Sequence, residues 1–235
     1  MSRAEVIHAD RLKKCATLEA AGLELYPGAS VRSHTAAEAL AQFDALHTNA
    51  TAVTVVGRIR SLRSHGKAAF FDVADATGKL QWFLSEEALG SAVFRQATTL
   101  FDEGDFIEGS GTLFVTARGE KSLGVTKLRL LAKSLRPVPS AWFGLKDKET
   151  RFRQRYLDLL TNPEVRQAFE TRSRIVQSIR RYLDNVGFLE VETPVLENTT
   201  GGADARPFKT HHNALDLDVY LRISCGELWQ KRLIV

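Results

Sequence analysis

Hydrophobic residues follow a helical spacing in the first fifty residues and a two-residue spacing after them. Residues 4–22 read as a helix, and Thr35–Glu38 forms a capping box ahead of a second helix. From 51 to 136 the alternation predicts three strands (52–62, 67–74, 79–84), a helix (86–100) and two more strands (105–117, 123–131). This order is typical of an OB-fold barrel, a frequent binder of single-stranded nucleic acid.

The second and third predicted strands form a hairpin around the turn at 75–78. A symmetric turn pairs Phe71 with Trp82 on the core face. Phe70 then lies on the opposite face, diagonal to Gln81, where both side chains can touch one ligand. A second interpretation is that Phe70 and Phe83 only pack under a loop.

The charge around this hairpin favours a polyanionic ligand. Between Thr51 and Phe71 there is no acidic residue, whereas arginine, lysine and histidine are all present there: Arg58, Arg60, Arg63, His65 and Lys67. An aromatic ring beside a basic rim can stack a base, which contributes about 1–3 kcal/mol. The amide of Gln81 can donate to and accept from a base edge. By contrast, Arg11, Lys13 and Lys14 in the first helix indicate either a solvated face or one near a phosphate backbone.

The remainder of the chain has a different pattern. Prolines, a glycine and a charge run predict a linker over 137–150. A long helix starting at Asn162-Pro163 carries an apolar stripe and ends at Gly187. We expect a short strand at 188–192, a glycine pair, a second extended run at 206–210 and a strand at 219–223. From 151 to 181 there are eight arginines against three acids, which indicates a subunit interface, a surface facing a nucleic acid or a solvated face.

The overall composition excludes several classes of protein. The chain has 235 residues, 44% of them hydrophobic and 26% charged, with a net charge of +4. No apolar run is long enough for a membrane span, and the first residues do not resemble a secretory signal. Cys15 and Cys225 do not form a disulfide framework, so we expect a cytoplasmic protein. His211-His212 has no third ligand at useful spacing, and we expect no metal site.

The stretch 187–212 resembles motif 1 and the following substrate loop of class II aminoacyl-tRNA synthetases, specifically the bacterial-type lysyl-tRNA synthetases. The signature GGAxARPFxTHHNALDxDxYLRI is complete over 201–223, and RxRQRYLDL is present at 151–159. The resemblance covers essentially the whole chain. It implies an α+β fold with an N-terminal helical extension, an OB-fold anticodon-binding domain, a linker and the incomplete start of an antiparallel-sheet catalytic domain (1–50, 51–136, 137–150 and 151–235).

The resemblance also implies roles for residues of the barrel. Arg63, Phe70 and Gln81 match the trio that reads the central anticodon uridine in lysine, aspartate and asparagine synthetases. Glu120 matches a lysine-type residue near the first anticodon base, although it can equally be a solvated hairpin tip.

In the second half, Gly202 and Glu227 match family positions that contact lysine. The usual run Ala-Pro-Glu-Leu is here one residue longer, 224–228, which shifts the register of Glu227 by up to one residue. Pro194 matches the motif proline at the dimer interface. The apolar stripe of the preceding helix either contributes to that interface or covers the sheet of its own subunit.

The function implied is ATP-dependent attachment of lysine to tRNA-Lys through lysyl-adenylate, in a homodimer that uses ATP and Mg²⁺. The sequence ends at Val235, before the expected motifs 2 and 3, so we expect a portion truncated before motif 2. We therefore expect no catalytic residue, no bound cofactor and no catalysis by this chain alone, but binding of the tRNA anticodon. Two alternatives stay open, namely a non-catalytic OB-fold binder of tRNA or single-stranded nucleic acid, and a dimerisation module.

Overall fold

The computed structural model describes residues 2–138, 145–199 and 204–234, with only the backbone described at 227 and 228. The chain divides into two units, Met1–Thr161 and Asn162–Val235. The division falls inside the predicted catalytic portion, so the short helices α6 (Lys148–Arg153) and α7 (Arg155–Thr161) belong to the first unit. The domain limits proposed from the sequence stay a prediction.

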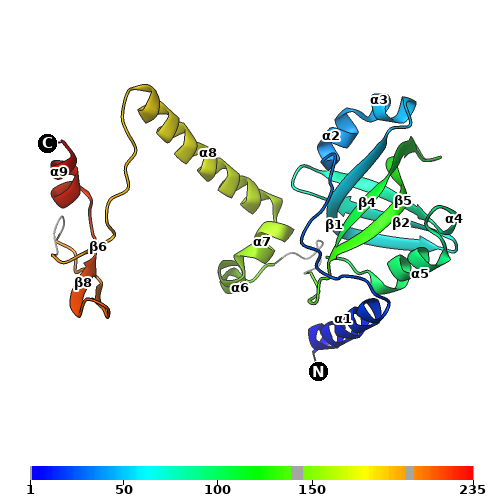
Figure 1. Cartoon of the computed structure of the whole chain (residues 1–235), viewed down its shortest axis with the longest axis horizontal. Coiled ribbons are helices and arrows are strands. Elements are labelled where there is room, and N and C mark those ends of the chain that lie inside the picture. Colours follow the sequence, from blue (N-terminus) through cyan, green and yellow to red (C-terminus); the bar gives the residue numbers. More distant parts are fainter. Residues whose placement is uncertain (1, 139–144, 200–203, 235) are drawn as a thin grey trace. The chain divides into compact units, whose positions relative to one another are not determined.

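The first unit contains a closed five-stranded barrel (Figure 1). Its strands are β1 (Ala52–His65), β2 (Ala68–Ala74), β3 (Lys79–Ser85), β4 (Phe106–Val115) and β5 (Lys121–Ala132), in the order β1-β2-β3-β5-β4. Only the β3–β5 pairing is parallel. The predicted OB-fold order is confirmed. The expected helix between β3 and β4 is two helices, α4 (Glu86–Leu89) and α5 (Ser91–Leu100), because Gly90 has a φ of +78° that ends the first.

The pairing of β2 with β3 follows the predicted register, with Phe71 opposite Trp82, Phe70 opposite Phe83 and Asp72 opposite Gln81. Phe71 and Trp82 are 0% exposed and form the centre of the core. The Trp82 ring lies so close to Gly109 of β4 that a Cβ there would collide with it. Hence the two faces of the hairpin separate packing residues from residues available to a ligand.

Three helices precede the barrel: α1 (Arg3–Ala20), α2 (Ala36–Ala41) and α3 (Phe43–Thr48). The capping box predicted for α2 is confirmed, since Thr35 accepts from the backbone N–H of Glu38 and the Glu38 carboxylate accepts from that of Thr35. Both interpretations of the basic cluster in α1 are wrong for Arg11. Its side chain is buried and donates to the carbonyl oxygens of Glu103, Ser134 and Arg136 at 2.8–3.0 Å.

Helix α1 lies near α5 (Figure 1). It is also held by a buried charge network. Lys133 pairs with Asp102 and with Asp105 at 2.7 Å, and Lys14 pairs with Asp102 at 2.7 Å. Burial acts to raise the pKa of Asp102, but hydrogen bonds from Lys133 and Lys14 outweigh it and lower that pKa. The network therefore stabilises the helix on the barrel and is not available to a ligand.

The second unit contains the long helix α8 (Pro163–Asn185), followed by a three-stranded sheet of order β6-β8-β7. Its strands are β6 (Leu196–Glu197), β7 (Lys209–His212) and β8 (Leu217–Leu221), and η1 (Gly226–Gln230) and α9 (Lys231–Ile234) come after them. Gly187, with a φ of +87°, follows the helix end as predicted. The strand expected at 188–192 is wrong, because these residues form no backbone ladder with a described strand, and the sheet is first entered at Leu196–Glu197.

The apolar stripe of α8 is exposed, and its members are Phe169, Ile175, Val176, Ile179 and Leu183. Among the described residues, no helix is both long and apolar enough to cross a membrane.

Candidate nucleic-acid interface

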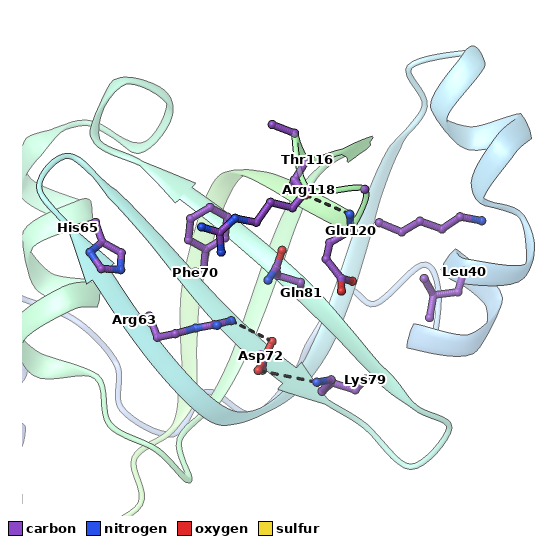
Figure 2. A pocket seen from close by; sticks show the side chains of 13 residues that line it. Leu40, Arg63, His65, Phe70, Asp72, Lys79, Gln81, Thr116, Arg118 and Glu120 are labelled. Carbon is purple, nitrogen blue, oxygen red and sulfur yellow. Dashed lines mark hydrogen bonds and ion pairs between the residues drawn. The ribbon is translucent and has the colours of Figure 1, made fainter.

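A pocket of ≈ 1040 Å³ opens on the barrel between the β1–β2–β3 face and the hairpin that joins β4 to β5 (Figure 2). Helix α2 contributes one wall residue, Leu40. All four residues that the sequence assigned to the anticodon line this pocket: Arg63, Phe70, Gln81 and Glu120. The charged side chains that line the pocket are the basic Arg63, Lys79, Arg118 and Lys121 and the acidic Asp72 and Glu120. With histidine neutral, the lining therefore carries a net positive charge.

Phe70 projects from β2 into the pocket and is half-buried (Figure 2). Behind it, Phe83 of β3 lies 5.2 Å away between ring centroids at an interplanar angle of 46°. Phe83 in turn meets Phe114 of β4 edge-on at 5.7 Å. The phenylalanines therefore form a supported row, and the ring at its open end is a rigid platform on which a base can stack. Phe70 and Phe83 do pack together, as the second interpretation has it, and Phe70 also lines the pocket together with the β4–β5 hairpin.

Gln81 lies beside Phe70 on the neighbouring strand (Figure 2). Its side-chain carbonyl oxygen accepts a hydrogen bond of 2.9 Å from the hydroxyl of Ser122 on β5. Within the described part of the chain, no hydrogen bond uses the Gln81 NH₂ group. That group is consequently a free donor at the floor of the pocket.

Arg63 reaches the pocket from β1, and its side chain is 55% exposed. A guanidinium nitrogen lies 3.8 Å from the Asp72 carboxylate, whose other oxygen is 3.8 Å from the Lys79 ammonium and accepts from Ser61 at 2.8 Å. Asp72 thus connects two cations on the pocket rim (Figure 2). Both cations are exposed enough to meet a phosphate as well.

Glu120 lies at the tip of the β4–β5 hairpin. The backbone N–H of Thr116 donates to the Glu120 carbonyl at 2.9 Å, and the N–H of Glu120 donates to the Thr116 hydroxyl at 3.1 Å. Gly119 makes the turn with a φ of +84°, a conformation that glycine adopts without strain. The turn fixes Glu120 on the side of the pocket away from Phe70, with Gln81 between them (Figure 2).

The candidate lysine site cannot be assembled in the same way. Gly202 lies outside the described residues, and Glu227 lies in η1 with its side chain outside them. Pro194 is exposed, and its carbonyl accepts from Arg222 at 3.0 Å. Over residues 2–138, 145–199 and 204–234, no group of three or more metal-ligating side chains comes together.

Sequence reasoning missed the pocket cations Lys79, Arg118 and Lys121. It also missed Asp72 as a bridge between rim cations and Ser122 beneath Gln81. The register already placed Asp72 beside Gln81. Ser122 gives no local signal, because it reaches Gln81 only through the parallel pairing of β3 with β5.

Comparisons with known proteins match both units. Residues 53–131 match the family described as OB-fold nucleic acid binding domain, and residues 147–235 match the tRNA synthetases class II (D, K and N). The chain is 52% identical over 226 residues to a lysine–tRNA ligase of Roseiflexus castenholzii, covering 96% of the chain and 46% of that protein. Lysine–tRNA ligases of Chloroflexus aurantiacus (50% identity, 97% of the chain, 47% of that protein) and Moorella thermoacetica (49%, 96%, 45%) are similar. The chain spans about half the length of these curated relatives.

Proposed function

The chain is a homologue of bacterial lysine–tRNA ligases, with an OB-fold domain followed by part of a class II synthetase domain, and from this premise we propose that it recognises the anticodon of tRNA-Lys. The observation that carries the proposal is the convergence of Arg63, Phe70, Gln81 and Glu120 on one pocket. These residues come from three strands and a hairpin tip, so only the folded barrel unites them.

The pocket suits an unstacked base with keto oxygens. The Phe70 ring offers a face for stacking, while Gln81 and Arg63 offer hydrogen-bond donors at the base edge. Uracil presents two keto oxygens at its edge, whereas cytosine replaces one of them by an amino group that would oppose a donor. The central anticodon uridine is therefore the base we assign to this pocket, and Glu120 is assigned to the first base.

In the whole protein we propose the complete ligase activity. Lysine and ATP give lysyl-adenylate and pyrophosphate, and the lysyl group is then transferred to the terminal adenosine of tRNA-Lys. ATP and Mg²⁺ supply the activated phosphate and its charge neutralisation. Gly202 and Glu227 are assigned to the lysine site, and this chain by itself is expected to bind tRNA without forming the adenylate. The similarity of the chain to this synthetase family supports a cytoplasmic localisation.

A homodimer is also part of the proposal. The stripe on α8 consists of exposed apolar side chains on a helix that precedes Pro194 in the chain, and burying them against a second copy would remove them from water. The same observation favours the second candidate function, a dimerisation module. Sedimentation of the chain across micromolar concentrations distinguishes a dimer from a monomer.

The anticodon proposal is tested by titrating the chain with anticodon stem-loops that differ only in the central base. With uridine replaced by cytosine, we expect affinity to fall about tenfold, the cost of about 1.4 kcal/mol for one opposed donor. Equal affinity for both loops at fixed salt contradicts the proposal and favours a binder of single-stranded nucleic acid without base preference.

A further inference from the structure

Ser122 of β5 is a buried polar residue aimed at the pocket floor. It is 0% exposed and stands opposite Gln81 in the parallel β3–β5 pairing. Its hydroxyl lies 2.9 Å from the Gln81 amide oxygen and 3.3 Å from the backbone carbonyl of Glu120. One hydroxyl thus contacts both the Gln81 side chain and the backbone of the hairpin tip that carries Glu120.

The geometry matters because the two ends of an amide have opposite hydrogen-bonding character. An amide whose oxygen is held by Ser122 turns its NH₂ group to the ligand, whereas the flipped amide presents an oxygen. The hydroxyl has a single proton to donate, and the shorter of its two contacts goes to Gln81. Burial excludes water that could replace this bond, so the preferred amide orientation is set by the protein before any base arrives.

We infer that Ser122 is a positioning residue that fixes the Gln81 amide with its donor end toward the pocket, and so sets the preference for a keto oxygen over an amino group on the central anticodon base. The inference rests on the proposed anticodon recognition and adds to it a residue that touches no base. Ser122 acts on selectivity through Gln81, while Phe70 acts on affinity.

Removal of the hydroxyl separates this role from a structural one. Ser122→Ala deletes one oxygen without adding volume, and the Gln81 amide then rotates between both orientations. The rotated amide accepts from the amino group of cytosine, so the loop with a central cytosine gains affinity while the uridine loop loses some. A purely structural role would weaken both loops by the same factor.

Ser110→Ala is the matched control. Ser110 is a strand serine on β4 whose hydroxyl shares a 2.8 Å hydrogen bond with Thr54, and it is not among the residues that line the pocket. Its variant should lose a similar amount of stability and keep the selectivity of the unchanged protein.

The experiment measures affinity for stem-loops with central uridine and central cytosine, at one salt concentration, for the unchanged chain, Ser122→Ala and Ser110→Ala. We expect the uridine preference of Ser122→Ala to fall at least threefold relative to both other proteins. If the unchanged chain prefers uridine and Ser122→Ala retains the full preference, this inference is overturned and the proposed function stands. If the unchanged chain shows no preference, the proposed function itself fails.

A thermal melt shows whether Ser122→Ala folds, and a second variant tests the inference if it does not. Ser122→Cys keeps a weak donor of similar shape, and its uridine preference should lie between those of the serine and alanine proteins. A cysteine variant with undiminished preference overturns the inference in the same way.

Discussion

Replacing Phe70 by alanine removes the stacking surface and leaves every charged group of the pocket in place. Phe70 is half-buried at the open end of the row formed with Phe83 and Phe114, so its outer face is the part available to a base. Stacking on such a ring is worth about 1–3 kcal/mol per base. This corresponds to a decrease of about 5- to 150-fold in affinity for the tRNA-Lys anticodon stem-loop.

The same substitution also affects folding, and the assay must separate the two effects. A fully buried phenylalanine costs about 3–5 kcal/mol on truncation, and the half-buried Phe70 should cost less because part of its surface is already in contact with water. Filter binding or fluorescence titration at fixed salt is therefore paired with a thermal melt of each variant. The dependence of affinity on salt should keep its slope, because the substitution removes no cation that could meet a phosphate.

Phe106→Ala provides the control, since Phe106 is a partly exposed phenylalanine on β4 that is absent from the pocket lining. The guanidinium of Arg58 lies 4.5 Å from the centroid of its ring, so this variant removes a cation–π interaction as well. It should lower stability without lowering affinity for the stem-loop. Affinity of Phe70→Ala equal to that of the unchanged chain, with both proteins folded, would refute the stacking argument.

Three further predictions follow from other parts of the molecule. Lys79→Ala or Arg118→Ala should reduce the slope of log affinity against log salt by about 0.7 for each phosphate that the protein no longer neutralises, and an unchanged slope would remove that residue from the interface. The Asp75 carboxylate accepts a hydrogen bond from the backbone N–H of Ala36 at the start of α2. Burial acts to raise the pKa of Asp75, but hydrogen bonds from the Thr77 hydroxyl and three backbone N–H groups outweigh burial and lower this pKa. Because the pKa of Asp75 is lower in the folded than in the unfolded chain, the ionised carboxylate stabilises the fold. This stabilisation is complete above the unfolded pKa of about 3.9 and is lost as the pH falls through the folded pKa. Asp75→Ala should therefore lower the melting temperature at pH 7, with the difference from the unchanged chain shrinking toward pH 2; a difference independent of pH would contradict this. On α8, Ile179→Asp should shift the chain toward monomer in sedimentation, and an unaltered distribution would remove the stripe from the interface.

Local patterns in the sequence were sufficient to predict the barrel and the face of the β2–β3 hairpin that carries Phe70. The two-residue period and the turn at 75–78 specify which side of the hairpin carries Phe70, and the register in the structure agrees. The helix predicted from 86 to 100 was broken because a single glycine with positive φ interrupts an otherwise continuous helical pattern.

Tertiary pairing determined what the sequence could not show. Arg11 looked like part of a solvated face, yet its donors satisfy three carbonyl oxygens from segments around residues 103 and 134–136. Ser122 became relevant only through the parallel pairing of β5 with β3. The strand expected at 188–192 has apolar residues in an extended pattern but finds no neighbouring strand among the described residues, so its backbone stays unpaired.

The central claim is that the ring of Phe70 meets the central base of the anticodon. The most direct measurement is photo-crosslinking of an anticodon stem-loop that carries 5-iodouridine at this position, followed by mass spectrometry of the joined peptide. We predict a crosslink within the β2–β3 hairpin, at Phe70, that disappears in Phe70→Ala. Crosslinks confined to other parts of the barrel, or a Phe70→Ala chain that crosslinks as efficiently at the same peptide, would contradict it.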